Sequence, residues 1–288
     1  MVGPPQLRAG IPPVDRRAVE SLTNKIAVVT GAGSGIGRAT ALTLARHGAT
    51  VALADIDMAS AKETAALVEG AARTSVHQVD VTSESAMRAF VDEVIGDHGS
   101  VDVVVNNAGV LDFSPLELER PEDIEATFRV NVIAPILLTR QSLAALRLSG
   151  SGHIVNVGSI FGSIAFPWFA TYSSSKFAIR GFSEALRREL RGSGISVTYV
   201  APRATATPLA TVFGRMAAAT GMPLDAPEAV AHRVVSALEN DAKDRYLGRA
   251  EPFFVRLNAL LPRLVDRALA GKTEQMKPFA VEAACNRS

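Results

Sequence analysis

TGAGSGIG, residues 30–37, directly follows the apolar run IAVV, residues 26–29, so a buried strand is predicted to lead through a glycine-rich turn into a helix. Glycine adopts the positive φ angles of a tight turn and lets a ligand approach the backbone closely. The start of the helix then offers unpaired N–H groups to an anion, which indicates a site for the pyrophosphate of a dinucleotide. The residues that would form it are Gly31, Ser34, Gly35, Ile36 and Gly37. A glycine-rich turn that only connects two elements is the alternative.

The composition favours a single α/β domain that binds a small molecule. Of the 288 residues 48% are hydrophobic, and no linker or change of composition divides them. The net charge is +1 with both signs interspersed, so the basic footprint of a nucleic-acid-binding protein is absent. No stretch reaches the roughly 18 uncharged apolar residues of a spanning helix, so no stable membrane insertion is expected.

Short apolar runs alternate with helical stretches along most of the chain. Runs that are apolar throughout are typical of a parallel sheet covered by helices on both faces. Right-handed crossovers then give a doubly wound sheet of about seven strands, the Rossmann fold. The predicted strands are residues 26–29, 51–54, 75–79, 101–105, 153–157, 195–200 and 245–247.

Three segments are expected along the chain. Residues 1–22 contain four prolines with charges between them and predict an irregular arm. Residues 23–250 predict the Rossmann-fold domain, and residues 251–288 a helical extension with a polar tail. The only cysteine, Cys285, lies in that tail, so no intrachain disulfide is possible and a reducing, cytoplasmic location is expected.

Asp55, at the end of the second predicted strand, bears on the choice of nucleotide. It lies about twenty residues after the glycine-rich turn, where a carboxylate accepts hydrogen bonds from the adenosine ribose and repels a 2′-phosphate. Ser34 and Ile56 occupy the two places where a basic residue would bind that phosphate. NAD is therefore favoured over NADP. Arg38 lies on the first helical turn, and we expect it to be solvated and not to bind phosphate.

Two further loops are expected at the carboxyl edge of the sheet, where ligands bind in such folds. Asp80 and Val81 follow the third strand and would bound the adenine, although Asp80 is equally suited to cap the next helix. The run Asn106-Asn107-Ala108-Gly109 follows the fourth strand. Asparagine side chains tie loops to the backbone, so a supporting role is expected for the first asparagine.

Tyr172 and Lys176 stand four residues apart at the start of a predicted helix, residues 172–190, so both project from one face. A tyrosine with a pKa of about 10 is a poor base at neutral pH, and a lysine ammonium beside it favours the phenolate. Ser159 follows the fifth strand, thirteen residues before Tyr172. Its hydroxyl could hold a substrate oxygen against the tyrosine, which indicates general acid/base chemistry.

With these motifs in this order, the chain resembles the short-chain dehydrogenase/reductase family over about residues 24–247. The family's catalytic tetrad falls on Asn131, Ser159, Tyr172 and Lys176. The resemblance implies a single-domain NAD(P)-dependent oxidoreductase in which the tyrosine is the general acid/base. It also implies that the lysine binds the nicotinamide ribose and that the serine orients the carbonyl or hydroxyl of the substrate.

Asn131 lies within a predicted helix, residues 122–147, and Pro135 follows four residues later. Proline has no N–H, so the Asn131 carbonyl loses its helical donor and a kink is expected. We expect this carbonyl to accept from an ordered water near Lys176, which would complete a proton relay to solvent. A kink that serves packing alone is the alternative.

One residue departs from the family pattern. After the sixth strand the family usually has Pro-Gly and a threonine-bearing loop at the nicotinamide, whereas here Pro202 is followed by Arg203. Arg203 is expected either to point to solvent or to contact the pyrophosphate or a substrate oxygen. Thr205 and Thr207 are candidates for contacts with the carboxamide or phosphates of the cofactor, or else cap the next helix.

The substrate pocket is expected to be apolar, because no basic cluster is evident for a phosphorylated substrate. A lipophilic ketone or secondary alcohol is therefore favoured. Residues 252–269 place apolar side chains at helical spacing, interrupted at Pro262, and are expected to pack on their own subunit or a neighbour. Arginines among them leave a membrane contact as an alternative. The candidate pocket residues are Leu111, Ile160, Phe161, Phe166, Trp168 and Phe213.

These features together predict an NAD-dependent alcohol dehydrogenase or carbonyl reductase. A non-catalytic dinucleotide-binding redox sensor is the alternative, although a sensor needs the glycine motif and not the acid/base pair. The helices predicted at 122–147 and 172–190 resemble those that pair between subunits in this family. A homodimer or homotetramer is therefore expected.

Overall fold

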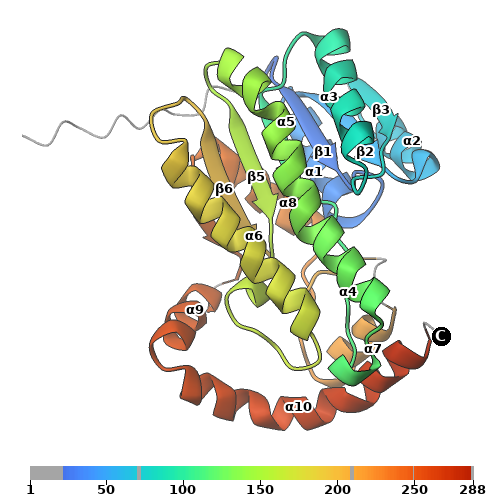
Figure 1. Cartoon of the computed structure of the whole chain (residues 1–288), viewed down its shortest axis with the longest axis vertical. Coiled ribbons are helices and arrows are strands. Elements are labelled where there is room, and N and C mark those ends of the chain that lie inside the picture. The colour runs from blue at the N-terminus through green and yellow to red at the C-terminus, as the bar shows by residue number, and fades with distance from the viewer. Residues whose placement is uncertain (1–21, 70–72, 208–210, 249, 287–288) are drawn as a thin grey trace, which may run out of the picture.

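The computed structural model describes residues 22–69, 73–207, 211–248 and 250–286. Within these residues, seven parallel strands form one sheet in the order β3-β2-β1-β4-β5-β6-β7 (Figure 1). The order reverses between β1 and β4, and the doubly wound parallel sheet predicted from the sequence is confirmed. The strands are β1 (Ile26–Thr30), β2 (Thr50–Asp55), β3 (Thr74–Gln78), β4 (Val103–Asn106), β5 (His153–Val157), β6 (Ser196–Ala201) and β7 (Asp244–Tyr246).

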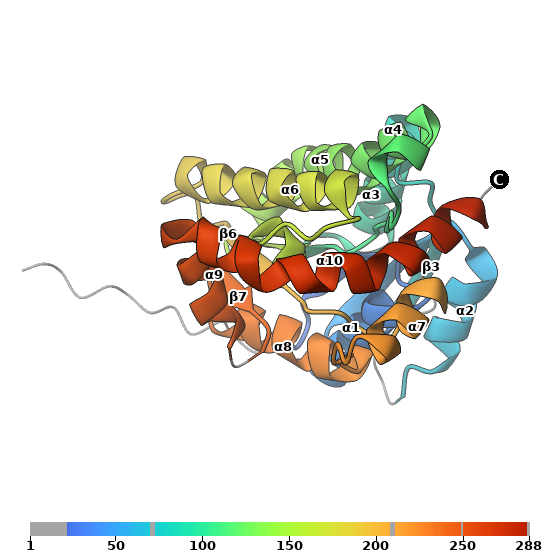
Figure 2. The same cartoon turned by 90° about the horizontal axis from the view of Figure 1, so that it is seen from below.

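Helices cover both faces of the sheet, because neighbouring residues of each apolar strand point to opposite sides. In β1, Ala27 and Val29 join one apolar core, and Ile26 and Val28 join the other. Figure 2 shows the two helical layers. The first consists of α1 (Gly35–Arg46), α2 (Met58–Ala66) and α8 (Pro227–Glu239), and the second of α3 (Glu84–His98), α5 (Ala134–Leu148) and α6 (Ala170–Glu189).

The helix predicted at residues 122–147 is three elements in the structure. α4 (Pro121–Phe128) passes through one π-helical turn, η2 (Arg129–Ile133), into α5. In this turn the Ala134 N–H donates to the Arg129 carbonyl, five residues back. Pro135 has no N–H for the carbonyl of Asn131, so the regular helix is interrupted at the place where the sequence predicted a kink.

A helical extension follows β7 and crosses the molecule beyond the carboxyl ends of the strands (Figures 1 and 2). α9 (Glu251–Leu260) and α10 (Pro262–Cys285) meet at Leu261, and α10 packs on α7 (Thr211–Ala219). The helix runs on to Cys285, which is exposed at its end and does not lie in a polar tail as predicted. None of the described helices is long and apolar enough to cross a membrane.

His153 in β5 is buried, and its Nε2 lies 2.8 Å from the Thr198 hydroxyl, which itself donates to a backbone carbonyl. Burial lowers the pKa of His153 to about 4, against a smaller opposing effect of Asp241. The unfolded chain takes up this proton at about pH 6.5, so the folded state should lose roughly 3 kcal/mol as the pH falls from about 6.5 to about 4.

Urea unfolding of the His153→Gln variant tests this prediction. Glutamine can donate the same hydrogen bond and does not titrate. The unfolding free energy of the variant should therefore lose most of its dependence on pH between about pH 6.5 and about pH 4. His232→Gln, at an exposed site, is the matched control and should keep this dependence. If the unfolding free energy of His153→Gln fell with pH as steeply as that of the wild type, His153 would not be the cause of the loss of stability.

Candidate active site

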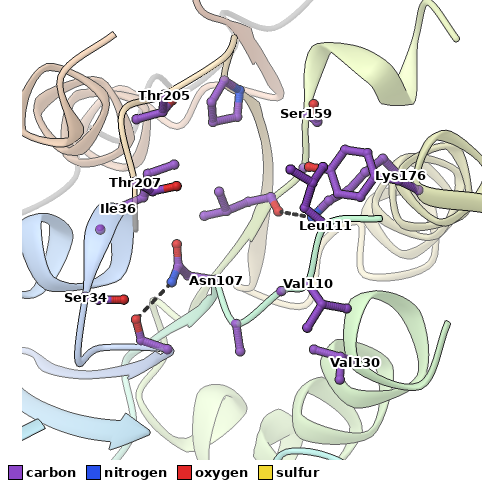
Figure 3. Close-up of a pocket in the computed structure, with 18 of the residues that line it drawn as sticks. Ser34, Ile36, Asn107, Val110, Leu111, Val130, Ser159, Lys176, Thr205 and Thr207 are labelled. Atoms are coloured by element: carbon purple, nitrogen blue, oxygen red, sulfur yellow. Dashed lines mark hydrogen bonds between the residues drawn. The ribbon is translucent and has the colours of Figure 1, made fainter. Parts of the chain in front are cut away.

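A cavity of about 460 Å³ opens at the carboxyl ends of the strands, where the strand order reverses. Its walls come from the turn after β1, the ends of β2 and β3, and the loops after β4, β5 and β6. Figure 3 labels wall residues from the turn after β1 and from the three loops. Two predicted site residues, Gly37 and Asn131, do not line it. The cavity brings together all the others: Gly31, Ser34, Gly35, Ile36, Asp55, Asp80, Val81, Asn107, Ala108, Gly109, Ser159, Tyr172, Lys176, Pro202, Thr205 and Thr207.

The glycine turn after β1 fits a pyrophosphate. Gly31 and Gly35 have φ angles of 64° and 53°, which side chains with a Cβ rarely adopt. A Cβ at Gly37 would lie 1.9 Å from the Gly31 carbonyl oxygen, so only glycine lets α1 approach the turn this closely. The first turn of α1 has no acidic residue, and the Ser34 hydroxyl makes no capping hydrogen bond. The N–H groups of this turn can therefore bind an anion.

Asn107 ties the glycine turn to the loop after β4. Its Nδ2 donates to the carbonyls of Thr30 at 2.9 Å and Gly31 at 3.3 Å, and its N–H donates to the Thr30 hydroxyl at 3.1 Å. Asn106 lies behind it in the interior and donates to the Asn156 side chain at 2.8 Å. The first asparagine thus has the supporting position that the sequence predicted.

Asp55 lines the cavity beside the same turn. Its Oδ2 accepts from the Gly33 N–H at 2.7 Å, and its Oδ1 accepts from the Asp57 N–H at 3.0 Å. A Cβ at Gly33 would lie 2.8 Å from Asp55 Oδ2, so glycine is needed at this second glycine position of the turn for the approach. A carboxylate has about four lone-pair sites, so both oxygens can accept a further donor.

Arg38 is not the solvated residue that the sequence predicted. Its guanidinium reaches α2, where Nε donates to the Thr64 hydroxyl at 3.0 Å and Nη2 donates to the Ser60 carbonyl at 3.3 Å. Nη2 also pairs with the Glu63 carboxylate at 3.0 Å. The first turn of α1 faces α2, which explains these contacts. Because its charge is already paired, Arg38 is poorly suited to bind a phosphate.

Asp80 forms the turn that leads from β3 toward α3. Its Oδ1 accepts from the N–H of Thr82 at 2.8 Å and from the Thr82 hydroxyl at 2.7 Å. The N-cap of α3 is Ser83, whose hydroxyl accepts from the Ala86 N–H at 3.3 Å. The alternative that Asp80 caps this helix is therefore wrong. Asp80 and Val81 lie in the cavity wall.

Tyr172 and Lys176 meet Ser159 at one end of the cavity (Figure 3 labels the serine and the lysine). The Tyr172 hydroxyl is hydrogen-bonded to the Ser159 side chain. The Lys176 Nζ lies 5.5 Å from the centroid of the tyrosine ring and 3.4 Å from the Val157 carbonyl. Ser159 Oγ also accepts from the Phe161 N–H at 3.1 Å, at the start of η3 (Ile160–Gly162), which fixes the position of the hydroxyl.

Asn131 contacts this group from behind through its side chain. Its Oδ1 accepts from the Val110 N–H and its Nδ2 donates to the Val110 carbonyl, both at 2.9 Å. Nδ2 also donates to the Ser175 hydroxyl at 3.1 Å, so Asn131 fastens the loop after β4 to α6. A Cβ at Gly109 would lie 3.2 Å from Asn131 Oδ1 and 3.6 Å from Lys176 Nζ. This geometry makes Asn131 a positioning residue.

The pKa of the tyrosine shifts in the direction opposite to the prediction. Burial raises the pKa of Tyr172 to about 12, and the hydrogen bond to Ser159 offsets only part of this shift. Burial lowers the pKa of Lys176 to about 8. The sequence predicted that the lysine charge would favour the phenolate, but desolvation disfavours the charged form of both groups. Tyr172 therefore carries its proton at neutral pH.

Arg203 takes neither of its two predicted positions. It lines the cavity, yet its guanidinium forms a bidentate ion pair with the Asp225 carboxylate. Nε donates to Oδ2 at 3.1 Å, and Nη2 donates to Oδ1 at 2.5 Å. Its Nη1 donates to the Glu251 carboxylate at 3.1 Å, at the start of α9. The planar fork of arginine suits such pairing. Arg203 thus clamps the loop after β6 to the segment before α8 and to the helical extension.

The two threonines of the same loop both line the cavity. The Thr205 hydroxyl donates to the Arg203 carbonyl at 3.0 Å. Thr207 lies against the glycine turn, because a Cβ at Gly35 would be 3.1 Å from Thr207 Cγ2. Whether either threonine caps α7 depends on residues 208–210, which lie outside the described part of the chain.

The helical extension forms a roof over the apolar cluster beside the cavity, and none of the described residues of α9 or α10 lines the cavity itself. The Trp168 Nε1 donates to the Thr273 carbonyl of α10 at 2.9 Å, and Asn258 of α9 donates to the Ser163 carbonyl at 3.0 Å. Phe166 and Trp168 were predicted to line the pocket, but they pack in an apolar cluster under this roof and do not reach the cavity wall. The predicted residues that do line it are Leu111, Ile160, Phe161 and Phe213.

Several wall residues were not predicted. Val130 lies in the π-helical turn beside Asn131, and the other seven adjoin a predicted motif at the end of a strand, which could have indicated them: Ile56, Val79, Thr82, Val110, Val157, Gly158 and Ala204. No feature of the sequence near Arg203 indicates its ion-pair partners. Asp225 and Glu251 are 22 and 48 residues away in the sequence.

Comparison with known proteins agrees with this geometry. The family model for short chain dehydrogenases matches residues 25–217. A putative oxidoreductase SadH from Mycobacterium tuberculosis is 40% identical over 173 residues, which are 60% of this chain and 63% of that protein, less than two thirds of its length. Human estradiol 17-beta-dehydrogenase 11 is 33% identical over 247 residues, which are 84% of this chain and 81% of that protein.

Two solved structures share the fold and hold a nicotinamide dinucleotide. A short-chain dehydrogenase/reductase from Burkholderia phymatum in complex with NAD aligns with a TM-score of 0.78 at 25% identity, over 85% of this chain and 96% of that one. A 3-ketoacyl-(acyl-carrier-protein) reductase from Brucella melitensis complexed with NADH aligns with a TM-score of 0.73 at 29% identity, over 79% of this chain and 98% of that one. Both support a cofactor of this kind in the cavity.

Arg203→Ala should loosen the helical extension. The change leaves the Asp225 and Glu251 carboxylates without their cation, a loss of about 1 to 3 kcal/mol. Hydrogen–deuterium exchange should rise in α9 and in the first turns of α10 and change little in β1 to β5. Arg38→Ala breaks an ion pair that does not involve α9 and is the control. Exchange in α9 equal to that of the wild type would show that the clamp does not hold the extension.

Proposed function

The chain belongs to the short-chain dehydrogenase family of oxidoreductases, and on this premise we propose that it transfers hydride between NAD(H) and a lipophilic secondary alcohol or ketone. One observation carries the proposal. A single cavity holds the glycine turn and Asp55 together with Ser159, Tyr172 and Lys176. A redox sensor would need only the nucleotide-binding residues, so the acid/base group favours an enzyme.

The dinucleotide is assigned to the space between the glycine turn and Lys176. The backbone of the turn would hold the pyrophosphate, Asp80 would bound the adenine, and the loop after β6 would contact the nicotinamide. When bound, the nicotinamide ring supplies or accepts the hydride. The protein supplies the position of the substrate and the path of the proton.

The preference for NAD over NADP is inferred from the charges around Asp55. Its carboxylate can accept from the ribose hydroxyls and repels a 2′-phosphate. Arg38 is paired with Glu63, and Ile56 beside Asp55 is apolar. Neither residue can therefore neutralise the charge of a 2′-phosphate beside Asp55.

Tyr172 is assigned as the general acid in ketone reduction. With a pKa of about 12, its hydroxyl is protonated at neutral pH and can donate to the carbonyl oxygen of the ketone. Ser159 would hold the same oxygen, and the Lys176 ammonium would stabilise the phenolate that is left. The Asn131 carbonyl, which lacks its helical donor, would bind a water that returns the proton from solvent.

The substrate is inferred to be apolar and uncharged. Leu111, Ile160, Phe161 and Phe213 supply apolar walls. Arg203 offers no free cation for a phosphorylated substrate, because two carboxylates already take its charge. The human relative is named for the dehydrogenation of estradiol, and that name supports the same class of substrate.

Asp55→Ala should narrow the preference for NAD over NADP. The variant loses a ribose acceptor and a repulsive charge, so NAD binding should weaken by about tenfold to a hundredfold while NADP binding holds or improves. Titration of both nucleotides by fluorescence measures this. Asp57→Ala is the matched control, since Asp57 caps α2 and does not line the cavity. A wild-type protein that prefers NADP would overturn the assignment.

Tyr172→Phe should separate an enzyme from a sensor. It removes one hydroxyl and keeps the ring, so NAD should still bind while turnover falls by about 10² to 10⁴. Turnover is followed by absorbance of the reduced cofactor with a panel of alcohols, sterols and hydroxyacyl compounds. Tyr246→Phe, whose hydroxyl contacts Ser163 outside the cavity, is the control.

The pH dependence adds a second readout to this experiment. Because Tyr172 is protonated up to a pKa of about 12 and Lys176 loses its proton at a pKa of about 8, ketone reduction should vary little between about pH 6 and about pH 7 and fall above about pH 8, whereas alcohol oxidation should rise toward alkaline pH. Near wild-type turnover in Tyr172→Phe would remove the tyrosine from the mechanism.

A further inference from the structure

The corner where α9 meets α10 exposes large apolar side chains. Residues 259–264 are all exposed, and Leu260 alone is 79% exposed. In Figure 1 this corner lies at the lower left, beyond the ends of the strands. The exposed apolar residues on the two helices are Phe253, Phe254, Leu260, Leu261 and Leu264, and we call them the apolar corner.

The extension has a separate inner face that packs on its own subunit. Val255, Met276 and Ala280 are buried in the apolar cluster under the roof. The hydrogen bond from Trp168 to Thr273 and the clamp formed by Arg203 hold the two helices in place. Because the inner face already provides the packing of the extension, the apolar corner is a second, outward face.

Basic side chains accompany the apolar corner. Arg256, Arg263 and Arg267 are exposed, and among the described residues none of them has an ion-pair partner. Residues 253–267, which span the apolar corner, contain three arginines and one acidic residue, Asp266, whereas the whole chain has a net charge of only +1. Positive charge is therefore concentrated beside exposed apolar groups.

We propose that the apolar corner docks on the surface of an anionic lipid bilayer, with its leucine and phenylalanine side chains in the headgroup region and the arginines on lipid phosphates. Apolar side chains flanked by arginines are the pattern of helices that lie in the membrane interface. An arginine near an anionic surface strengthens binding by about fivefold, so three arginines account for on the order of a hundredfold.

A second copy of the chain fits this surface less well than lipid does. A two-fold contact through the corner would place the same patch against itself, so arginines would face arginines. An anionic bilayer complements both the apolar groups and the charge. Since α9 and α10 pack in the same apolar cluster as Ile160 and Phe161 of the cavity wall, docking would bring the bilayer close to that side of the cavity. The proposal does not depend on the proposed substrate, because binding is measured without turnover.

Co-sedimentation of the full chain with vesicles tests the proposal. We expect binding to vesicles of phosphatidylcholine and phosphatidylglycerol that is on the order of a hundredfold tighter than to phosphatidylcholine alone, and that weakens with added salt. Two triple variants should each abolish most of it: Phe254→Ser with Leu260→Ser and Leu261→Ser, and Arg256→Glu with Arg263→Glu and Arg267→Glu.

Matched controls keep the test decisive. Leu148→Ser removes a leucine that is 89% exposed at the end of α5, and Arg88→Glu reverses an exposed charge on α3, so both should bind like the wild type. Circular dichroism melting checks that every variant is folded. Equal binding to both kinds of vesicle, or wild-type binding by either triple variant, would overturn the proposal. So would a fall in mass by light scattering in the serine variant, because the corner would then be a subunit contact.

Discussion

The approach of α1 to the end of β1 is the contact on which the site depends. No Cβ fits between Gly37 and the Gly31 carbonyl, so the helix can begin almost on top of the strand end only with glycine at that position. Asn107 fastens the same turn from β4. β1 and β4 are neighbours in the sheet although their connections leave in opposite directions, and the cavity opens between those connections.

Burial determines the protonation of Tyr172 and Lys176, the proposed acid/base pair. Both residues lie on α6: Lys176 is buried, with its Nζ on the Val157 carbonyl at the end of β5, and Tyr172 is half-buried at the cavity wall. In such a place both groups favour their neutral forms, so the tyrosine keeps its proton and the lysine holds its proton less strongly. In the chain alone, Tyr172 is therefore better suited to donate a proton than to accept one.

Local patterns in the sequence predicted most of the sheet and the site. Apolar strands, the glycine turn and the spacing of Tyr172 and Lys176 depend on neighbouring residues, and the structure places them as expected. The failures concern distant partners. Nothing near Arg203 in the sequence indicates Asp225 or Glu251, and the direction of the tyrosine pKa depends on how much protein surrounds it.

The aromatic residues show the same limit. Phe161 and Phe166 stack on each other, with ring centroids 4.6 Å apart, yet only Phe161 reaches the cavity. Both are phenylalanines of the same segment, so the sequence does not indicate which of them reaches the cavity. Phe166 and Trp168 pack instead against an apolar cluster that includes residues of α10, and Trp168 bonds to Thr273, more than a hundred residues later in the chain.

The match to the family model ends at residue 217, whereas the helices that cover the apolar cluster beside the cavity are built from residues 251–285. The proposed proton-transfer group and this cover thus come from separate stretches of polypeptide, which are joined by apolar packing, the Arg203 clamp, the Arg215–Glu282 ion pair and two hydrogen bonds. Such a division lets selection reshape the cover while the proposed proton-transfer group stays unchanged. Diversity of substrates among related chains can then arise at the carboxyl terminus, without any cost to the machinery that the first two hundred residues provide.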